Sequence, residues 1–403
     1  MGDFFQGGPI ATMHNLKLKS TEELEHELTN YGQRRPIGLV LPSLFSELEG
    51  EALARIISEL KKVPYLSRII IGLDKADKAD FDFAKKYFSN LPQKHAILWH
   101  DGPRLKELAQ ELEDNGLAPP EPGKGRNVWY CFGYLLGTRS IDTVGLHDCD
   151  IITYNRGMLA RLLYPVANPL FPYVFSKGYY PRVNGEKFGG RVTRLFVSPL
   201  INALQKICGR SDYLSYIESF RYPLAGEFAM RVHLLPDLRI PSDWGLEIGV
   251  LSEVMRHYNY RAITQVEIAD IYDHKHQKVS FDDNTTGLNR MSVDIAKAIF
   301  RKLATEGEVF SIEKFRTIKA TFYREALDKI ENYSNDAIMN GLKIDRHGEE
   351  EAVELFASNI MTAGETFLNN PMETPVLKAW SRVHAALPGF IEKYVKAVEK
   401  DNA

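Results

Sequence analysis

Two aspartates separated by one residue, Asp148 and Asp150, follow a short apolar run in the segment Ile141–Ile151. Side chains two residues apart on an extended strand point to the same face, so both carboxylates can face one hard cation. Carboxylate oxygens and the phosphate oxygens of a ligand together suit Mg²⁺ or Mn²⁺. This DxD spacing predicts a divalent-metal site that binds a nucleotide diphosphate, although a plain acidic turn after a strand has the same pattern.

A single lysine, Lys124, lies between two glycines in the loop Gly116–Asn127. Glycine lets the backbone come close to a ligand, so this lysine is a candidate phosphate contact. The alternative is a surface lysine in a glycine turn, and its position one helix before the aspartates favours the ligand role. The chain has no GxxxxGK[ST] sequence, so the loop is not a Walker A motif.

A second candidate for anion binding is Gly189–Thr193, where two glycines and Arg191 open a predicted helix. A helix N-terminus with a guanidinium and a hydroxyl suits a phosphate or a carboxylate. The alternative is a glycine turn that Thr193 caps. Glu227 and Glu247 each follow a glycine closely, and glutamates at helix starts are often only partners of the helix dipole.

Two histidines, His274 and His276, follow the last predicted strand, Ala262–Asp270. A histidine in this position is most often structural or solvated. Imidazole also binds Mg²⁺ or Mn²⁺ beside carboxylates, so a histidine that returns to Asp150 would complete a metal site.

Strands and helices alternate in the first half of the chain, which predicts a parallel sheet with right-handed crossovers. The predicted strands are Pro36–Ser43, Ser67–Asp74 and His95–Asp101. Ligands collect at the carboxyl ends of such strands. The segments expected to share this edge are Leu41–Glu47, Gly72–Asp74 and Asp148–Asp150.

The composition is that of a soluble globular protein, with 403 residues, 44% hydrophobic and 26% charged. A net charge of −3 gives no reason to expect nucleic acid or an anionic membrane as the main partner. Three cysteines without a CxxC pattern favour a reducing cytoplasm. The N-terminus has no signal pattern and no long apolar run follows, so we expect a cytoplasmic protein without membrane insertion.

Four motifs occur in a fixed order: GGRVTRLFVSPL from Gly189, YPLAGEFA from Tyr222, WGLEIGVL from Trp244 and VEIADIYDHKH from Val266. Together they resemble the glucosyl-3-phosphoglycerate synthases, which are retaining glycosyltransferases. The resemblance implies an α/β fold of the GT-A class, a Rossmann-like nucleotide-diphospho-sugar transferase. Its mostly parallel sheet would be flanked by helices and followed by a C-terminal helical extension.

The resemblance also divides the chain. Residues 1–19 are expected to be a mobile arm, and Ser20 with Glu23 forms a capping box for a first helix. Amphipathic segments fill the end of the chain. Their charged faces are most simply solvated surface, and we expect packing or a homodimer rather than chemistry as the role of these segments. The predicted parts are an N-terminal arm and helix (1–35), a catalytic domain (36–280, with a nucleotide-binding part 36–150 and an acceptor-binding part 151–280) and a helical extension (281–403).

The resemblance implies roles for residues at matching positions. Asp150 and His274 match the metal ligands, for Mg²⁺ or Mn²⁺, and catalytic roles are implied for Glu247, Asp150 and Arg191. The implied donor-binding residues are Pro42, Ser43, Leu44, Glu47, Asp74, Lys124, Asp148, Cys149, Trp244, Gly245, Leu246 and Glu247. The implied acceptor-binding residues are Gly190, Arg191, Val192, Thr193 and His276.

The chain departs from the family pattern at three places. Phe45, Ser46 and Glu47 stand where the family usually has an Asn-Glu pair. Trp244 stands where a tyrosine is usual, and His276 stands where an asparagine touches the acceptor. All three differences lie where the base, the sugar or the acceptor would be contacted.

The implied reaction is retaining transfer of glucose from an NDP-glucose, most simply UDP-glucose, to 3-phospho-D-glycerate, a small anionic acceptor. The product, glucosyl-3-phosphoglycerate, is a precursor of the compatible solute glucosylglycerate. Alternatives are mannosyl transfer from GDP-mannose and transfer to free D-glycerate. A sugar nucleotidyltransferase would need a glycine-rich loop that LPSLFSELEG lacks, and an intact aspartate pair with His274 disfavours a non-catalytic scaffold.

Overall fold

The computed structural model of the chain describes residues 6–274, 287–372 and 376–403. A small hairpin of β7 (Val183–Asn184) and β8 (Lys187–Phe188) lies apart from the main sheet. The strands of the main sheet are β1 (Ala11–Met13), β2 (Ile37–Leu44), β3 (Leu66–Asp74), β4 (His95–Trp99), β5 (Thr143–Leu146), β6 (Phe175–Tyr179), β9 (Phe228–Arg231) and β10 (Ile263–Glu267).

Fourteen α-helices surround the sheet within the described residues. A π-helical turn, Thr193–Val197, leads into one of them. The helices are α1 (Thr21–Gly32), α2 (Glu51–Leu60), α3 (Lys78–Phe88), α4 (Pro103–Asp114), α5 (Lys124–Thr138), α6 (Arg156–Ala167), α7 (Ser198–Cys208), α8 (Asp212–Ser219), α9 (Leu246–His257), α10 (Gly287–Thr305), α11 (Ile312–Met339), α12 (Arg346–Asn369), α13 (Trp380–Ala386) and α14 (Phe390–Asn402).

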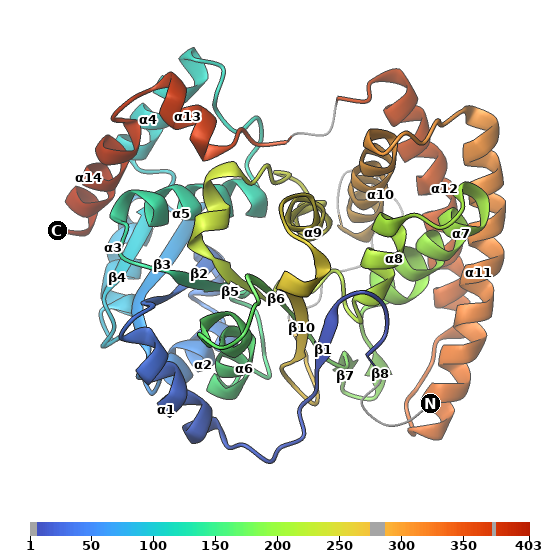
Figure 1. Ribbon diagram of the computed structural model, residues 1–403, viewed down its shortest axis with the longest axis horizontal. Helices are drawn as coiled ribbons and strands as arrows, with labels where there is room; N and C mark the ends of the chain where they lie inside the picture. Colours follow the sequence, from blue (N-terminus) through green and yellow to red (C-terminus); the bar gives the residue numbers. More distant parts are fainter. Residues whose placement is uncertain (1–5, 275–286, 373–375) are drawn as a thin grey trace.

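The main sheet has the strand order β1-β10-β6-β9-β5-β2-β3-β4 (Figure 1). Its neighbouring strands are parallel except β9, which is antiparallel to both β5 and β6. The predicted α/β fold, with a mostly parallel sheet flanked by helices, is therefore confirmed. The exception is β9, which directly follows Glu227, a residue that the sequence analysis grouped with glutamates at helix starts.

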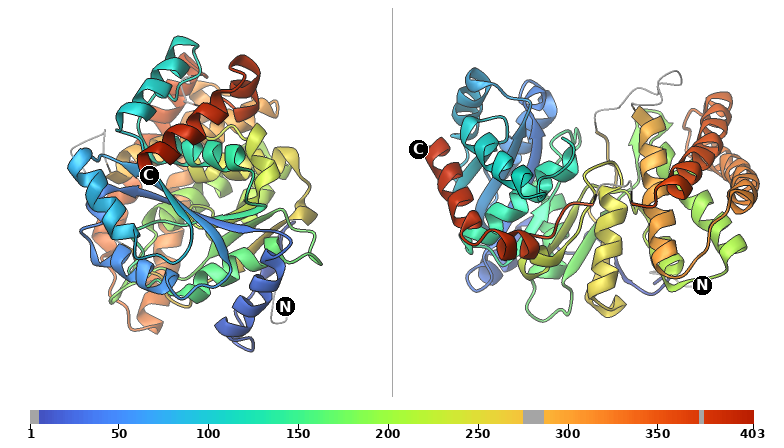
Figure 2. Two further views of the ribbon diagram at one scale, coloured as in Figure 1. Left: turned by 90° about the vertical axis from the view of Figure 1, so that its left-hand side faces the viewer. Right: turned by 90° about the horizontal axis from the view of Figure 1, so that it is seen from above.

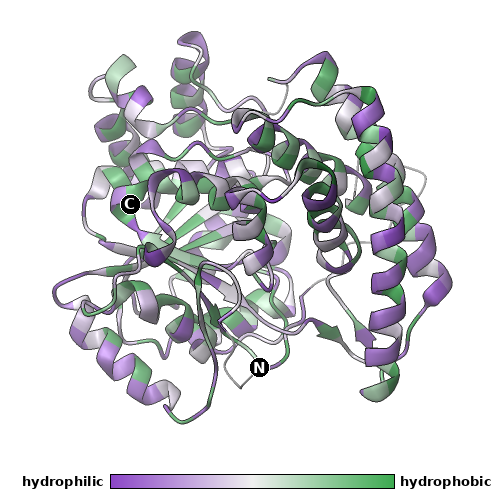
Figure 3. Cartoon of the chain, turned by 45° about the vertical axis from the view of Figure 1, so that its right-hand side comes forward, coloured by the Kyte–Doolittle hydropathy of each residue, from purple (hydrophilic) through white to green (hydrophobic). Residues whose placement is uncertain are grey.

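Helices cover both faces of the sheet because its strands are apolar on both sides. Along β3, Ile70 belongs to one buried apolar cluster, and Ile69 and Ile71 belong to the other. Residues that alternate along a strand point to opposite faces, so the two clusters are the cores on the two sides of the sheet. In Figure 3 the strands are mostly green, whereas the surface helices alternate between green and purple.

The N-terminal segment differs in part from the expectation. The capping box is confirmed, because the Ser20 side chain accepts from Glu23 N and Glu23 Oε2 accepts from Ser20 N. Residues 1–19 were expected to be a mobile arm, yet Ala11–Met13 form a strand that pairs with β10. The strand forms because the edge of β10 offers unpaired backbone groups that this segment satisfies.

The C-terminal helices are split between two places. Helices α10, α11 and α12 pack with α7 on one side of the molecule, whereas α13 and α14 return to β4, α4 and α5 (Figure 2). The side-chain amide of Asn402 bonds the backbone N and O of Ile97, at 2.9 and 2.8 Å, and so satisfies these two groups on the edge strand β4. Among the described residues, no helix is long and apolar enough to cross a membrane.

A pair of tryptophans fixes the C-terminal segment, α13 and α14, against α5. Trp129 on α5 stacks on Trp380 with ring centroids 4.1 Å apart, and each indole N–H donates to a backbone carbonyl of the other segment. A Cβ at Gly133 would lie 2.0 Å from the Trp380 ring, so only glycine allows this approach. The contact fixes α5, whose first residue is Lys124.

We expect Trp380→Ala to lower the free energy of unfolding by about 3–5 kcal/mol, because it removes a buried indole and leaves a cavity. Chemical denaturation followed by fluorescence measures this change. Leu170→Ala is the control: this side chain is 87% exposed, and its loss should change the free energy by less than about 0.5 kcal/mol. Equal small effects from both variants would show that the packing of Trp380 on α5 does not stabilise the fold.

Candidate functional site

The carboxyl ends of β2, β3 and β5 meet at one edge of the sheet, as the sequence predicted. Leu44 pairs with Asp74 at the ends of β2 and β3, and β5 ends beside β2 at Leu146. Asp74 accepts from Arg126 at 2.8 Å and from the Asn127 amide at 2.9 Å. The first turn of α5 is thereby fixed to this edge.

Lys124 joins three parts of the chain. Its Nζ lies 2.6 Å from Asp148 Oδ1, in the segment after β5, and 3.1 Å from Glu247 Oε1, in the first turn of α9. Burial acts to lower the pKa of Lys124, but the two carboxylates outweigh burial and raise it. Burial likewise acts to raise the pKa of Asp148, yet Lys124 holds it below its ordinary value. Lys124 and Asp148 can therefore both remain ionised in a partly buried site.

The glycines around Lys124 have a different role from the one expected. Lys124 lies in the first turn of α5 rather than in a loop. A Cβ at Gly125 would lie 2.1 Å from Pro241 O, and one at Gly123 would lie 2.8 Å from Ser242 O. The glycines therefore let the backbone approach another segment of this chain, which places α5 next to α9.

Asp150 and His274 come together although 124 residues separate them. A β-bridge between Ile151 and His274 aligns the two segments, and His274 Nδ1 lies 3.4 Å from Asp150 Oδ2. Asp150 Oδ1 is buried without a hydrogen-bond partner, which is the state expected of a carboxylate that awaits a cation. Within the described ranges, no third histidine, cysteine or carboxylate joins the pair.

Asp148 and Asp150 do not lie on an extended strand, which the predicted metal site assumed. Strand β5 ends at Leu146, so the alternation of an extended strand does not reach Asp148 or Asp150. Asp148 faces Lys124, whereas Asp150 faces His274. The chain after β5 is irregular and directs the two carboxylates to different partners, and the metal site that the spacing predicts stays a prediction.

Arg182 connects the diglycine loop, Gly189–Gly190, to His274. The sequence analysis did not identify this residue. The Arg182 guanidinium contacts His274 Nε2 and donates to Tyr222 Oη at 2.9 Å. Gly189 N donates to Arg182 O at 2.9 Å, and Gly190 has a φ of +66°, which favours glycine. No local motif marks Arg182, because its importance comes from contacts distant in sequence.

The predicted acceptor residues begin the π-helical turn before α7. Thr193 Oγ1 is buried without a hydrogen-bond partner, and no side chain caps this turn, so Thr193 does not serve as a cap. Val192 is buried, and Arg191 is partly buried. His276 lies outside the described residues.

A buried carboxylate, Glu227, lies next to this centre. It accepts from Tyr180 at 2.6 Å and from Tyr272 at 2.7 Å, and burial followed by the charge of Asp148 raises its pKa. Glu227 precedes β9, so it is not a helix-dipole partner. The preceding Gly226 has no room for a side chain, because a Cβ there would lie 2.4 Å from Asp148 Oδ2.

The remaining predicted donor residues differ in exposure. Leu44 is 39% exposed and accessible to a ligand, whereas the side chain of Leu246 is buried in the core. Burial raises the pKa of the Cys149 thiol, so it stays protonated and is no nucleophile. The other members are Pro42 and Ser43 in β2, Glu47 in a 3₁₀ turn, and Trp244 and Gly245 before α9.

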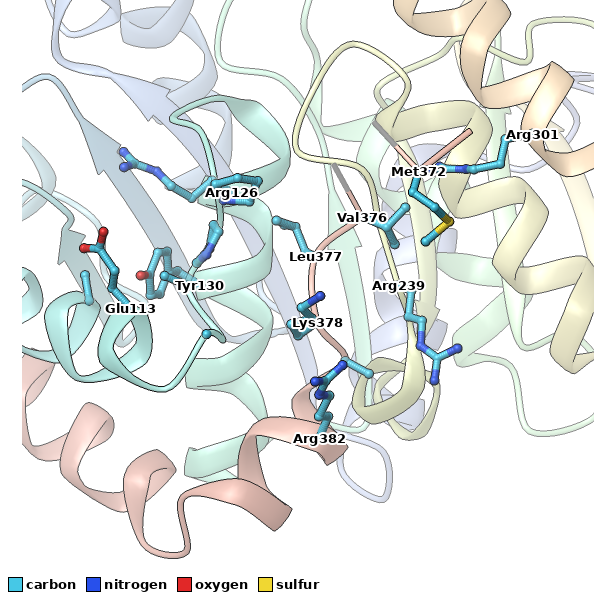
Figure 4. A pocket seen from close by; sticks show the side chains of 16 residues that line it. Glu113, Arg126, Tyr130, Arg239, Arg301, Met372, Val376, Leu377, Lys378 and Arg382 are labelled. Atoms are coloured by element: carbon cyan, nitrogen blue, oxygen red, sulfur yellow. The ribbon is translucent and has the colours of Figure 1, made fainter. Parts of the chain in front are cut away.

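A separate cavity of about 800 Å³ lies between α4, α5 and residues 376–379 (Figure 4). Its lining contains none of the predicted site residues. Five cationic side chains line it, but Arg126 is paired with Asp74 and the charge of Arg301 faces Asp243. The cluster around Lys124 and Asp150 is therefore the stronger candidate site.

We expect Gly226→Ala to reduce by about tenfold or more the release of nucleotide from a sugar-nucleotide donor, the activity that the resemblance implies, because the new methyl group must push the Asp148 carboxylate aside. The thermal midpoint should change little, since the displaced atom ends a side chain. Gly32→Ala is the control, because its Cβ would meet only ordinary contacts at 3.6 Å or more. Full activity in Gly226→Ala would mean that the position of Asp148 is unimportant.

Comparison with known proteins identifies the family. No family model matches the chain. It is 46% identical over 403 residues to a glucosyl-3-phosphoglycerate synthase of Persephonella marina, covering 100% of both chains. It is 36% identical over 404 residues to a glucosyl-3-phosphoglycerate synthase of Methanococcoides burtonii, covering 99% of this chain and 98% of that one.

Solved structures share the fold. The Mycobacterium tuberculosis glucosyl-3-phosphoglycerate synthase in complex with Mn²⁺, UDP-glucose and phosphoglyceric acid has a TM-score of 0.54 at 22% identity, over 73% of this chain and 88% of that one. A mannosyl-3-phosphoglycerate synthase from Rubrobacter xylanophilus also has a TM-score of 0.54, at 21% identity over 74% and 83% of the chains. From its full-length similarity to the two relatives, this chain belongs to the glucosyl-3-phosphoglycerate synthase family of glycosyltransferases.

Proposed function

We propose that the chain transfers glucose from UDP-glucose to 3-phospho-D-glycerate with retention of configuration, together with Mg²⁺ or Mn²⁺. The names of both relatives and the ligands of the M. tuberculosis structure support this reaction. The observation that carries it is the approach of His274 Nδ1 to Asp150 Oδ2, at 3.4 Å, next to the diglycine loop. A metal site and an anion site would then open onto one cleft.

Asp150 and His274 are the residues that would hold the cation. The buried and unpartnered Asp150 Oδ1 fits this role, because a buried carboxylate oxygen normally has a partner. A bound divalent cation neutralises the charge that develops on the leaving diphosphate. With two ligands from the protein, the phosphates of the donor and water would supply the rest.

The other residues bind and orient the two substrates. Lys124 adds positive charge next to Asp148 and holds Glu247 in place, and we expect Glu247 to orient the glucose. Arg182 and Arg191 would bind the anionic acceptor together with the diglycine loop.

Retention requires either a nucleophile or attack from the same face of the sugar. Asp148 and Glu247 are both paired with Lys124, and Cys149 is a protonated thiol. We therefore propose front-face attack, in which the acceptor hydroxyl bonds to the anomeric carbon as the bond to phosphate breaks. The departing phosphate oxygen takes the hydroxyl proton, so the atoms balance without a covalent intermediate.

We expect Asp150→Asn to lower kcat by about 100-fold or more at saturating metal, because an amide is a weaker cation ligand than a carboxylate. The assay measures UDP release with 3-phosphoglycerate present. Asp142→Asn is the matched control, since Asp142 lies at the other end of β5 and pairs with Arg231. An active Asp150→Asn protein would contradict the metal site and support the non-catalytic alternative.

A panel of sugar nucleotides and acceptors tests the identity of both substrates. The protein and Mg²⁺ are incubated with UDP-, GDP- and ADP-sugars, with and without 3-phosphoglycerate or D-glycerate. We expect release of UDP from UDP-glucose that depends on 3-phosphoglycerate. Acceptor-dependent release from GDP-mannose would instead favour mannosyl transfer, and release that depends on no acceptor would contradict the proposed reaction.

The proposed product is a precursor of glucosylglycerate, so we propose a role in compatible-solute synthesis. The cytoplasmic location and the homodimer stay predictions from composition and from the charged helix faces.

A further inference from the structure

Lys177 is a lysine that is almost completely buried and that no predicted role uses. It lies on β6, and its side chain is 1% exposed. Its Nζ donates to Ala225 O and lies 5.5 Å from the centroid of the Phe228 ring. Within the described part of the chain it forms no ion pair. A buried ammonium without an ion pair is costly, so its presence needs an explanation.

The charges that act on Lys177 are those of the candidate site. Burial lowers its pKa to about 8, while Glu247 and Glu227 oppose that change. The charges of Lys124 and Asp148 act on it as well. Lys177 is therefore close enough to the cluster around Lys124 for their charges to interact, and its side chain is too deeply buried to contact a substrate.

Three carboxylates meet at this place, and Lys124 alone does not balance them. Asp148 and Glu247 pair with Lys124, whereas the charge of Asp148 raises the pKa of the buried Glu227. A second positive charge close by reduces the repulsion among the three. Lys177 is a buried cation near this place, and the charges of Glu247 and Glu227 both act to raise its pKa.

Lys177 is also connected to the site through the backbone. The carbonyl that accepts from it belongs to Ala225, and the next residue is Gly226. The Cα of Gly226 lies so close to Asp148 that a Cβ would lie 2.4 Å from Asp148 Oδ2 and 3.0 Å from Lys124 Nζ. Any movement of the turn at Ala225 is thus transmitted to the Asp148–Lys124 pair.

We propose that Lys177 is a positioning residue for glycosyl transfer. Its ammonium holds the Ala225–Glu227 turn against Asp148 and supplies the second positive charge near the site. It touches no substrate and acts through Ala225 O and the neighbouring carboxylates. This inference rests on the proposed transferase function.

The test compares substitutions of two residues that pair across the neighbouring strands β6 and β10. Lys177→Met removes the charge and nearly keeps the volume. Gln265→Met is the matched control, because Gln265 pairs with Lys177 in the sheet and is equally buried. Its side chain bonds Thr12, Ser219 O and Arg221 N instead of the carbonyl of Ala225. Both proteins are assayed for kcat, for both KM values and for thermal midpoint.

We expect Lys177→Met to lower kcat by about tenfold or more with each KM changed by less than about threefold, because the loss is of positioning rather than binding. Its thermal midpoint should change little, because the relieved cost of burying a charge offsets the lost bond to Ala225 O and the added repulsion among the carboxylates. Gln265→Met should keep its kcat. A wild-type kcat in Lys177→Met overturns the inference, as does a parallel loss of kcat and thermal midpoint in both variants.

A pH profile gives a second measurement that a purely structural lysine would not affect. The charged form of Lys177 is present below its pKa of about 8 and is lost above it. We therefore expect kcat of the unchanged protein to fall as the pH rises through about 8, and this fall to be absent in Lys177→Met. If that variant does not fold, a flat kcat from pH 7 to 9.5 in the unchanged protein overturns the inference.

The two proposals fail in different ways. An unchanged protein that turns over no sugar nucleotide contradicts the proposed function. An unchanged protein that is active, with a Lys177→Met variant that is equally active at every pH, contradicts only the role of Lys177.

Discussion

The site depends on one interaction, the bridge from Lys124 to Asp148 and Glu247. It joins the start of α5, the segment after β5 and the start of α9, so three elements that pack separately are fixed to one another. Burial opposes the charge on Lys124, and the two carboxylates more than offset that penalty. Because Lys124 and Asp148 stabilise each other's charge, both can remain ionised where they are partly shielded from water.

The rest of the chain supports this bridge from a distance. Helix α5 is fixed to the edge of the sheet by Asp74 and packed from outside by Trp380, and its glycines allow contact with residues 241–242. The C-terminal helices therefore contact two separate parts of the molecule, since α11 and α12 pack against the π-helical turn Thr193–Val197 and α14 packs against α5.

Several buried polar groups near the site carry an energetic cost. Glu227 keeps a raised pKa between two tyrosines, Lys177 has a lowered one, and Asp150 Oδ1 has no partner. Apolar residues of similar size would pack at lower cost in these positions. Such groups tend to occur where function requires them, and their concentration at one edge of the sheet marks the site independently of any motif.

The sequence by itself determined the alternation of strands and helices and the family, because periodicity and ordered motifs are local properties. It also predicted the edge of the sheet where the candidate site residues gather. It located Asp148, Asp150, Lys124 and His274, but not their pairing, and it missed Arg182 altogether. The tertiary structure alone decided that Asp148 faces Lys124 while Asp150 faces His274, and that β1 and α14 complete the two edges of the sheet. These contacts join residues far apart in the chain, and their energies depend on burial and distance, which no local pattern contains.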